Sequence, residues 1–139
     1  MAGNLLDDVK KYFVSQSLTA SIPTVVGSTL GFGRNLFIGR EPSSPVNCIT
    51  IYPTGSYSPD ISRSTETPTI QIRIRNTSYF TGYKIGNMIG KKFHENTDIC
   101  ASSRGKCFAI QSQVIPIGIT DDATAHLFVI NFMFKNIRY

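Results

Sequence analysis

The chain has 139 residues, of which 41% are hydrophobic and 17% charged, and its formal net charge is +5. This length and composition fit a single domain spanning residues 1–139 that buries a core without a cofactor or disulfide, and they exclude a disordered chain. The positive charge favours acidic partners, but the basic residues are scattered, which disfavours a dedicated nucleic-acid binder.

Cysteine usage and hydropathy indicate a protein that stays in a reducing cytoplasm. Cys48, Cys100 and Cys107 show no CxxC spacing, which argues against a zinc site and a secreted disulfide framework. We favour free thiols over a Cys100–Cys107 pair. The first 13 residues carry acids where a signal peptide has its apolar run, and no apolar run reaches the roughly 18 residues of a membrane span.

The N-terminal region predicts an amphipathic helix. Apolar residues recur at helical spacing from Leu5 to about Ser17, Asn4 is a suitable N-cap, and Asp7 can pair with Lys11 one turn later. Residues 17–35 are rich in Ser, Thr and Gly without any period, so we expect an irregular connection there.

The next region predicts a short apolar run, one strand and a long loop. A short apolar run at 36–39 and a turn at 40–45 precede a strand at 46–52. Residues 53–68 contain prolines and no apolar period, so we expect a loop, and loops of this length tend to be functional.

Residues 69–76 predict a strand with one buried face, because isoleucines alternate with Gln71, Arg73 and Arg75. The two arginines have two interpretations. We favour a solvated sheet face over the alternative, which is a wall that faces DNA or an acidic protein surface.

A second helix is predicted from Thr77 or Ser78 to about His94. Gly82, Gly86 and Gly90 fall on its apolar side, where close approach to a sheet would offset a cost of about 1 kcal/mol each relative to Ala. Phe80 falls on the opposite side, with the lysines.

The C-terminal part predicts two β runs, 106–119 and about 125–136, which follow a polar loop at 95–105 and are joined by a turn at 120–124. The last run is apolar on both faces, so it is an interior strand or is covered by another subunit. The fold class is therefore α+β, with a mainly antiparallel β-sheet and two amphipathic helices.

Catalytic chemistry finds no support in the sequence. The two histidines are interpreted as a helix-end residue (His94) and a core or interface residue (His126), and Asp121 and Asp122 fall in a predicted turn. No HExxH, GxSxG, P-loop or paired-carboxylate spacing is present. We expect no enzyme activity, cofactor or metal.

An ordered set of segments resembles a known family. "LFIGREP" (36–42), "YPTGSYSPD" (52–60), "PTIQIRIR" (68–75) and "SYFTGY" (78–83) follow the N-terminal helix. Together they resemble the bacteriophage minor capsid protein family, whose members are similar to tail-terminator (tail-completion) proteins of long-tailed phages. The resemblance covers about the first two thirds of the chain.

This resemblance implies a tail-terminator-like domain with a structural role in the virion. Such proteins form rings, commonly hexamers, on the last ring of the tail tube, where they stop growth and present a surface to the head connector or stopper protein. The implied partners are further copies of the chain, the tail tube protein, the connector and, transiently, phage DNA, with no membrane. Assembly would take place in the cytoplasm of the bacterial host.

A closed ring requires two different complementary patches on each subunit. Our candidates for the ring lumen or the subunit interface are Arg73, Arg75, Phe80, Tyr57, Asp60 and Arg63. The alternative functions are a head-completion or stopper neck protein and a small basic nucleic-acid-binding module.

Overall fold

The computed structural model describes residues 5–18, 36–42, 47–57, 67–95, 99, 106–109, 114–120 and 124–135. In chain order its elements are α1 (Leu5–Leu18), β1 (Leu36–Ile38), β2 (Cys48–Tyr57), β3 (Thr67–Asn76), α2 (Tyr79–Phe93), β4 (Lys106–Ala109), β5 (Ile115–Ile119) and β6 (His126–Lys135). The strands form one sheet in the order β1-β2-β3-β6-β4, and β5 also pairs with β6. Only the β1–β2 pair is parallel, which confirms the predicted α+β class with a mainly antiparallel sheet.

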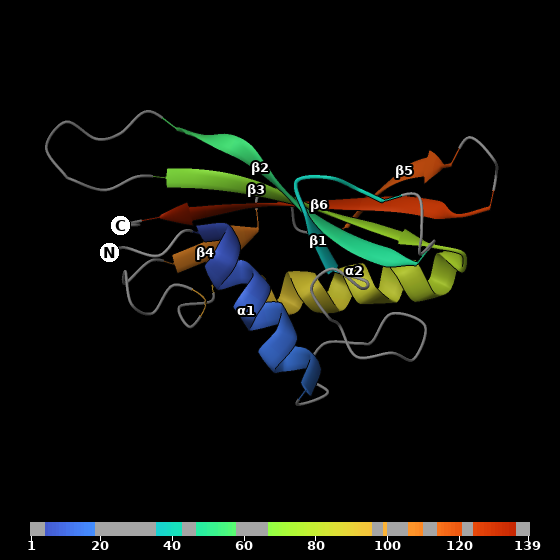
Figure 1. Cartoon of the computed structure of the whole chain (residues 1–139), viewed down its shortest axis with the longest axis horizontal. Helices are drawn as coiled ribbons and strands as arrows, with labels where there is room; N and C mark the ends of the chain where they lie inside the picture. The colour runs from blue at the N-terminus through green and yellow to red at the C-terminus, as the bar shows by residue number, and fades with distance from the viewer. Residues whose placement is uncertain are drawn as a thin grey trace, which may run out of the picture.

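Both helices lie on the same side of the sheet (Figure 1). We call this side the helix-covered face. Its residues are the alternate apolar side chains of the strands, because successive side chains of a strand point to opposite faces. Each of the following is at most 2% exposed: Leu36, Ile49, Ile51, Ile70, Ile72, Ile74, Phe128, Ile130, Phe132 and Phe134. The alternation predicted for 69–76 is therefore confirmed.

The start of α2 is fixed by three polar side chains. Ser78 is its N-cap and accepts a hydrogen bond from the Thr81 backbone N–H at 3.3 Å. Just before it, the Asn76 side chain accepts from the Ser78 N–H at 2.9 Å, and the Asn47 side chain accepts from the Thr77 N–H at 2.7 Å. The turn from β3 into α2 is thus tied to the start of β2.

Two of the three glycines in α2 allow the helix to lie close to the sheet. A Cβ added at Gly82 would lie 2.5 Å from Cε2 of Phe128, and one at Gly86 would lie 2.6 Å from Cγ2 of Val114. At Gly90 an added Cβ would meet nothing within 4 Å. The predicted close approach is therefore confirmed at Gly82 and Gly86 and wrong at Gly90. Residues spaced by four advance about 40° per step around a helix, so Gly90 lies beside the buried side, although Phe93 beyond it still packs on Phe132 of β6 with the ring centres 5.0 Å apart.

Helix α1 packs its apolar side against the end of α2. Val9 and Phe13 are fully buried, and the rings of Phe13 and Phe93 lie 5.1 Å apart. On the polar side, Asp7 pairs with Lys10 at 3.0 Å and with Lys11 at 2.9 Å. Both lysines lower the pKa of Asp7. The predicted helix and its Asp7–Lys11 pair are confirmed, whereas the predicted cap Asn4 and residues 19–35 lie outside the described residues.

The loop predicted at 53–68 is shorter than expected. Residues 53–57 belong to β2 and 67–68 to β3, and only 58–66 lie outside the described residues. The strand tolerates Pro53 because β1 pairs only with residues 49–51 and leaves that edge free, and because the register shifts between Pro53 and Gly55.

The run predicted at 106–119 forms two strands instead of one. Both pair with β6, β4 along its second half (Phe132–Lys135) and β5 along its first (His126–Val129). Strand β6 therefore lies between β3 on one side and β4 and β5 on the other, which confirms the prediction of an interior strand.

Candidate interaction surfaces

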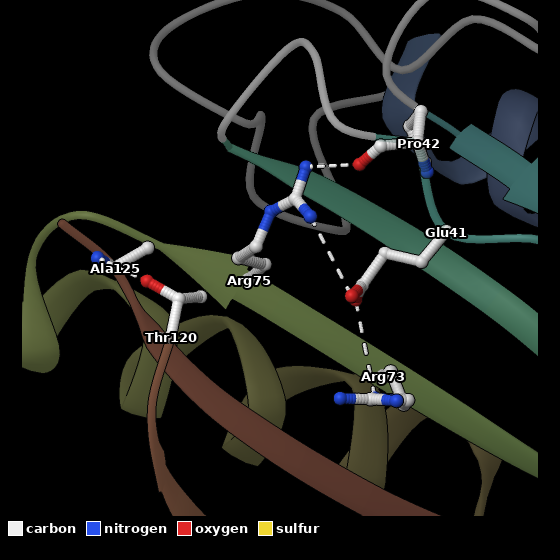
Figure 2. Close-up of polar contacts among 6 residues, drawn as sticks. All are labelled: Glu41, Pro42, Arg73, Arg75, Thr120 and Ala125. Atoms are coloured by element: carbon white, nitrogen blue, oxygen red, sulfur yellow. Dashed lines mark hydrogen bonds and ion pairs between the residues drawn. The ribbon is translucent and has the colours of Figure 1, made fainter. Parts of the chain in front are cut away.

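Arg73 and Arg75 face an acidic residue of their own chain. The Glu41 carboxylate lies between them, 3.5 Å from Nη1 of Arg75 and 3.9 Å from Nε of Arg73 (Figure 2). Nη2 of Arg75 also donates a hydrogen bond of 2.6 Å to the Pro42 carbonyl oxygen. We call Glu41, Arg73 and Arg75 the charged cluster. It lies on the face of the sheet opposite the helices, which we call the polar face.

The parallel pairing of β1 with β2 explains why Glu41 reaches the arginines. After β1 the Gly39 N–H donates to the Ile51 carbonyl at 2.8 Å, so the chain first continues along β2. It must then return to the start of β2, because the two strands run in the same direction. Glu41 and Pro42 belong to this return segment, and their contacts with β3 place that part of it over the polar face.

The two arginines differ in how firmly they are held. Arg75 is only 8% exposed and has both the ion pair and the hydrogen bond. The side chain of Arg73 is 27% exposed, and the separation of 3.9 Å between Arg73 Nε and Glu41 Oε1 is too long for a hydrogen bond, so both buried atoms lack such a partner. Arg75 is therefore a structural anchor, and Arg73 is attracted to Glu41 more loosely.

The pKa values of two neighbouring side chains on β2 indicate that the polar face is partly shielded from water near the charged cluster. Cys48 lies opposite Arg75 in the β2–β3 pair. Burial raises the pKa of its thiol, although the positive charge of Arg75 acts in the opposite direction. Burial also raises the pKa of Tyr52, and the negative charge of Glu41 adds to that effect. The charged cluster thus lies in a partly desolvated environment, where the loss of one partner is costly.

The favoured interpretation of the arginines as a solvated face is wrong for Arg75, which is buried against Glu41 and Pro42. Glu41 was not among the predicted site residues. The signal for it was weak, since it lies in a proline-containing turn more than 30 positions before the arginines and nothing local links them.

A second surface consists of exposed apolar side chains. Among the described residues the exposed large hydrophobics are Tyr79 (40%), Phe80 (85%), Ile117 (47%) and Ile119 (56%). Tyr79 and Ile119 lie at the same end of the sheet, because the Tyr79 ring is 5.4 Å from the His126 ring and Ile119 is the Cα partner of His126. We call these four residues the apolar end.

Strand β5 is a free edge with built-in irregularities. It contains Pro116, its register with β6 shifts between Pro116 and Gly118, and Gly118 has a φ of +128°. The hairpin to β6 is closed by two bonds: the Ala125 N–H donates to Oγ1 of Thr120 at 3.2 Å (Figure 2), and the Thr120 N–H donates to the Ala125 carbonyl at 2.9 Å. Proline and a bulge disfavour indiscriminate strand pairing at such an edge.

The other predicted site residues are placed only in part. Phe80 lies at the start of α2 and is highly exposed, as predicted. Tyr57 is the last residue of β2, while Asp60 and Arg63 lie outside the described residues. His94 is the C-cap of α2, where its N–H donates to the Gly90 carbonyl at 3.0 Å, and His126 packs edge-to-face against Tyr79.

In the part of the chain that the structure describes, no three His, Cys, Asp or Glu side chains gather in a way that could hold a metal ion. Within the same residues, neither helix is long and apolar enough to cross a membrane. What the described geometry offers is two kinds of contact surface, one charged and one apolar.

Comparison with known proteins identifies one family. A family model described as "Bacteriophage tail terminator protein" matches residues 14–135, which is nearly the whole chain. No curated protein sequence matches the chain.

Proposed function

The chain belongs to the bacteriophage tail terminator family, and from this premise we propose that it forms a hexameric ring at the head-proximal end of the tail tube. There it stops growth of the tube and joins the tail to the head connector. The observation that carries this proposal is the family match over residues 14–135. A structural role in the phage tail belongs to the family itself. The ring, the connector contact and assembly in the host cytoplasm are steps of the proposal.

The two edges of the sheet supply a pair of different patches, which a closed ring of identical subunits needs. Among the described strands, the free edges are β1 on one side and β5 with β4 on the other. Strand β1 is parallel to β2, and the pairs β2–β3, β3–β6 and β6–β5 are each antiparallel, so β5 runs opposite to β1. In a ring, β5 of one copy and β1 of the next would therefore be antiparallel. We place the contact between neighbouring subunits at these edges.

The chemistry of β5 supports this placement. Residues 114–120 carry no charge, and Ile117 and Ile119 are exposed. The core of protein interfaces is depleted in charged residues. Because Pro116 and the bulge limit main-chain pairing, the contact would rely mainly on the isoleucine side chains, which favours a shaped neighbour over any passing strand.

Of the two arginines, Arg73 is the better candidate to line the lumen of the ring. Arg73 keeps a partly exposed side chain, whereas the guanidinium of Arg75 is committed to Glu41 and Pro42. The residues at or beyond the end of β2, namely Tyr57, Asp60 and Arg63, stay candidates for the lumen or for a subunit boundary. Phe80 was a candidate for the same role, but its exposed position at the start of α2 suits contact with a different protein better. A moderately basic lumen would suit the passage of DNA.

The test is native mass and negative-stain imaging of the purified chain, alone and after mixing with tail tubes assembled without it. The expected result is rings, or density that caps one end of each tube. Ile119→Asp should prevent this by placing a charge in the apolar contact. Thr81→Asp adds the same charge at an exposed position in the first turn of α2, where an acid suits the helix dipole, and should leave the rings intact.

Other outcomes would redirect the proposal. A chain that ignores tubes but binds heads would be a stopper or head-completion protein. A monomer that binds neither, yet binds duplex DNA with an affinity that falls steeply with salt, would be a nucleic-acid-binding module.

A further inference from the structure

The side of α2 that faces away from the sheet carries a regular stripe of three exposed side chains. Phe80, Lys84 and Lys91 are spaced by four and seven residues, so they lie on one side of the helix over about 16 Å. This side is opposite the buried one, which carries Gly82, Ile85, Gly86, Ile89 and Phe93. We call Phe80, Lys84 and Lys91 the outer stripe.

The outer stripe combines an apolar side chain with positive charge that the helix does not neutralise. Helix α2 contains no Asp or Glu, although acids at helical spacing from a lysine commonly pair with it. Within the described parts of the chain, neither Lys84 nor Lys91 forms an ion pair. Phe80 is 85% exposed, and among the described aromatic rings its neighbour is the adjacent, half-exposed Tyr79, with the ring centres 6.0 Å apart.

We propose that the outer stripe docks onto an acidic protein surface of another virion component, with Phe80 inserted into an apolar site and Lys84 and Lys91 paired with carboxylates. The proposal rests on the proposed function in taking the partner from the tail–head junction. It differs from the proposed ring contact, because it assigns this side of α2 to a different protein and not to the neighbouring subunit. Aromatic anchors surrounded by polar contacts are the usual energetic centres of such interfaces.

Among the described residues, a second copy of the chain offers little acidic surface to the outer stripe. The acids among the described residues are Asp7, Asp8, Glu41 and Glu95. Asp7 is paired with Lys10 and Lys11, Glu41 lies between two arginines, and Glu95 lies 4.0 Å from His94. Asp8 is close enough to Lys11 to raise the pKa of that lysine. The described surface therefore offers a second copy no acidic patch of its own.

Duplex DNA also fits less well than an acidic protein. Two lysines would release few counterions, giving a salt dependence of only about −1.8 in log–log slope, far below that of dedicated DNA binders. The phosphate backbone offers Phe80 no apolar site. An acidic protein surface can satisfy both the lysines and the phenylalanine.

The test uses the full chain and two variants, Phe80→Ser and the double reversal Lys84→Glu/Lys91→Glu. The control is Lys11→Glu, which reverses an exposed charge on the polar side of α1, outside the outer stripe and outside both edges of the sheet. Binding to tail tubes assembled without this protein and to isolated heads is titrated at low and high salt. Thermal melts of each variant establish that it folds.

We expect loss of binding to whichever particle the wild type recognises. Phe80→Ser should weaken it about 30-fold, the effect of removing an interface anchor. The double reversal should weaken it at least tenfold at low salt and less at high salt, because salt screens exposed charges. Lys11→Glu should stay within about twofold of wild type, because an exposed charge outside the contact affects mainly the association rate.

Each alternative outcome is distinguishable. If the wild type binds tubes or heads and both variants bind equally well, the outer stripe is not the docking surface, while the proposed function stands. If the wild type binds neither particle, the proposed function itself fails. If the variants lose ring formation, or lose only binding to a 30-base-pair duplex, the occupant is a second copy or DNA, and the proposal is overturned.

Discussion

The two faces of the sheet are stabilised in different ways. On the helix-covered face, apolar side chains from four strands meet α1 and α2, and glycines 82 and 86 let α2 lie so close that a single added methyl group would clash. On the polar face, a segment that crosses over β3 holds Arg73 and Arg75 through the Glu41 carboxylate and the Pro42 carbonyl, and Gln71 of β3 donates a hydrogen bond to Asn131 of β6. The first face depends on shape, and the second on the pairing of residues far apart in the chain.

The strongest way to break the helix-covered face is Gly82→Leu. Its Cβ alone would lie 2.5 Å from the fully buried ring of Phe128, so α2 must move away from the sheet. We expect the free energy of unfolding to fall by about 3 kcal/mol, the upper end of overpacking costs. The measurement is urea denaturation.

Gly90→Leu is the matched control, because its Cβ meets nothing within 4 Å. It should unfold at the same urea concentration as wild type or at a higher one. Equal losses at both glycines would mean that a leucine side chain is poorly accommodated at either position, and that close contact with the sheet at Gly82 does not explain the first result.

On the polar face, Arg75→Ala should lower the free energy of unfolding by about 2 kcal/mol, because it leaves a partly buried Glu41 carboxylate with one partner fewer. Arg73→Ala should cost less than about 1 kcal/mol, since that pair is longer and more exposed. Thermal or chemical denaturation of both variants tests the difference. Equal losses would contradict the assignment of Arg75 as the anchor.

Gly90→Ala tests the helix-covered face with a substitution that should stabilise the protein. With no contact to preserve and a helix-interior position, the alanine should raise the free energy of unfolding by about 0.5–1 kcal/mol. A rise in melting temperature would show it. A fall would mean that Gly90 is needed for a contact outside the described residues.

The smallest effect is expected at Phe80. Because 85% of this residue is exposed, Phe80→Ser should change the free energy of unfolding by less than about 0.5 kcal/mol. Comparison of urea midpoints checks this. A large loss of stability would place the ring in a contact within the chain and weaken its assignment as a docking residue.

The helix-covered face was largely readable from the sequence, because its signals are local. The alternation of Ile70, Ile72 and Ile74 defined the buried side of β3, and Ser78 marked the start of α2. Even the close approach at Gly82 and Gly86 followed from helical spacing. The failure at Gly90 has a geometric cause, since residues spaced by four advance about 40° per step around the helix and the third glycine falls beside the buried side.

The polar face was not readable in the same way. Glu41 meets Arg75 because β1 pairs in parallel with β2 and the chain must return across the sheet, and that pairing depends on a three-residue strand without a clear pattern. Pro53 suggested a loop, but the free edge beside β2 tolerates it. The sequence predicted one β run over 106–119 but not the exposure of Ile117 and Ile119. Their exposure depends on which strands lie beside β5, and the local pattern does not show that.

The position of β6 in the sheet has a consequence for synthesis of the chain. It is the last of the described strands to leave the ribosome, yet β3, β4 and β5 all pair with it. Until residues 126–135 have emerged, β3 has an open edge, and β4 and β5 have no strand to join among those described. A nascent chain therefore cannot present a finished β5 edge to a neighbour, and subunits can associate through it only after β6 of each has emerged.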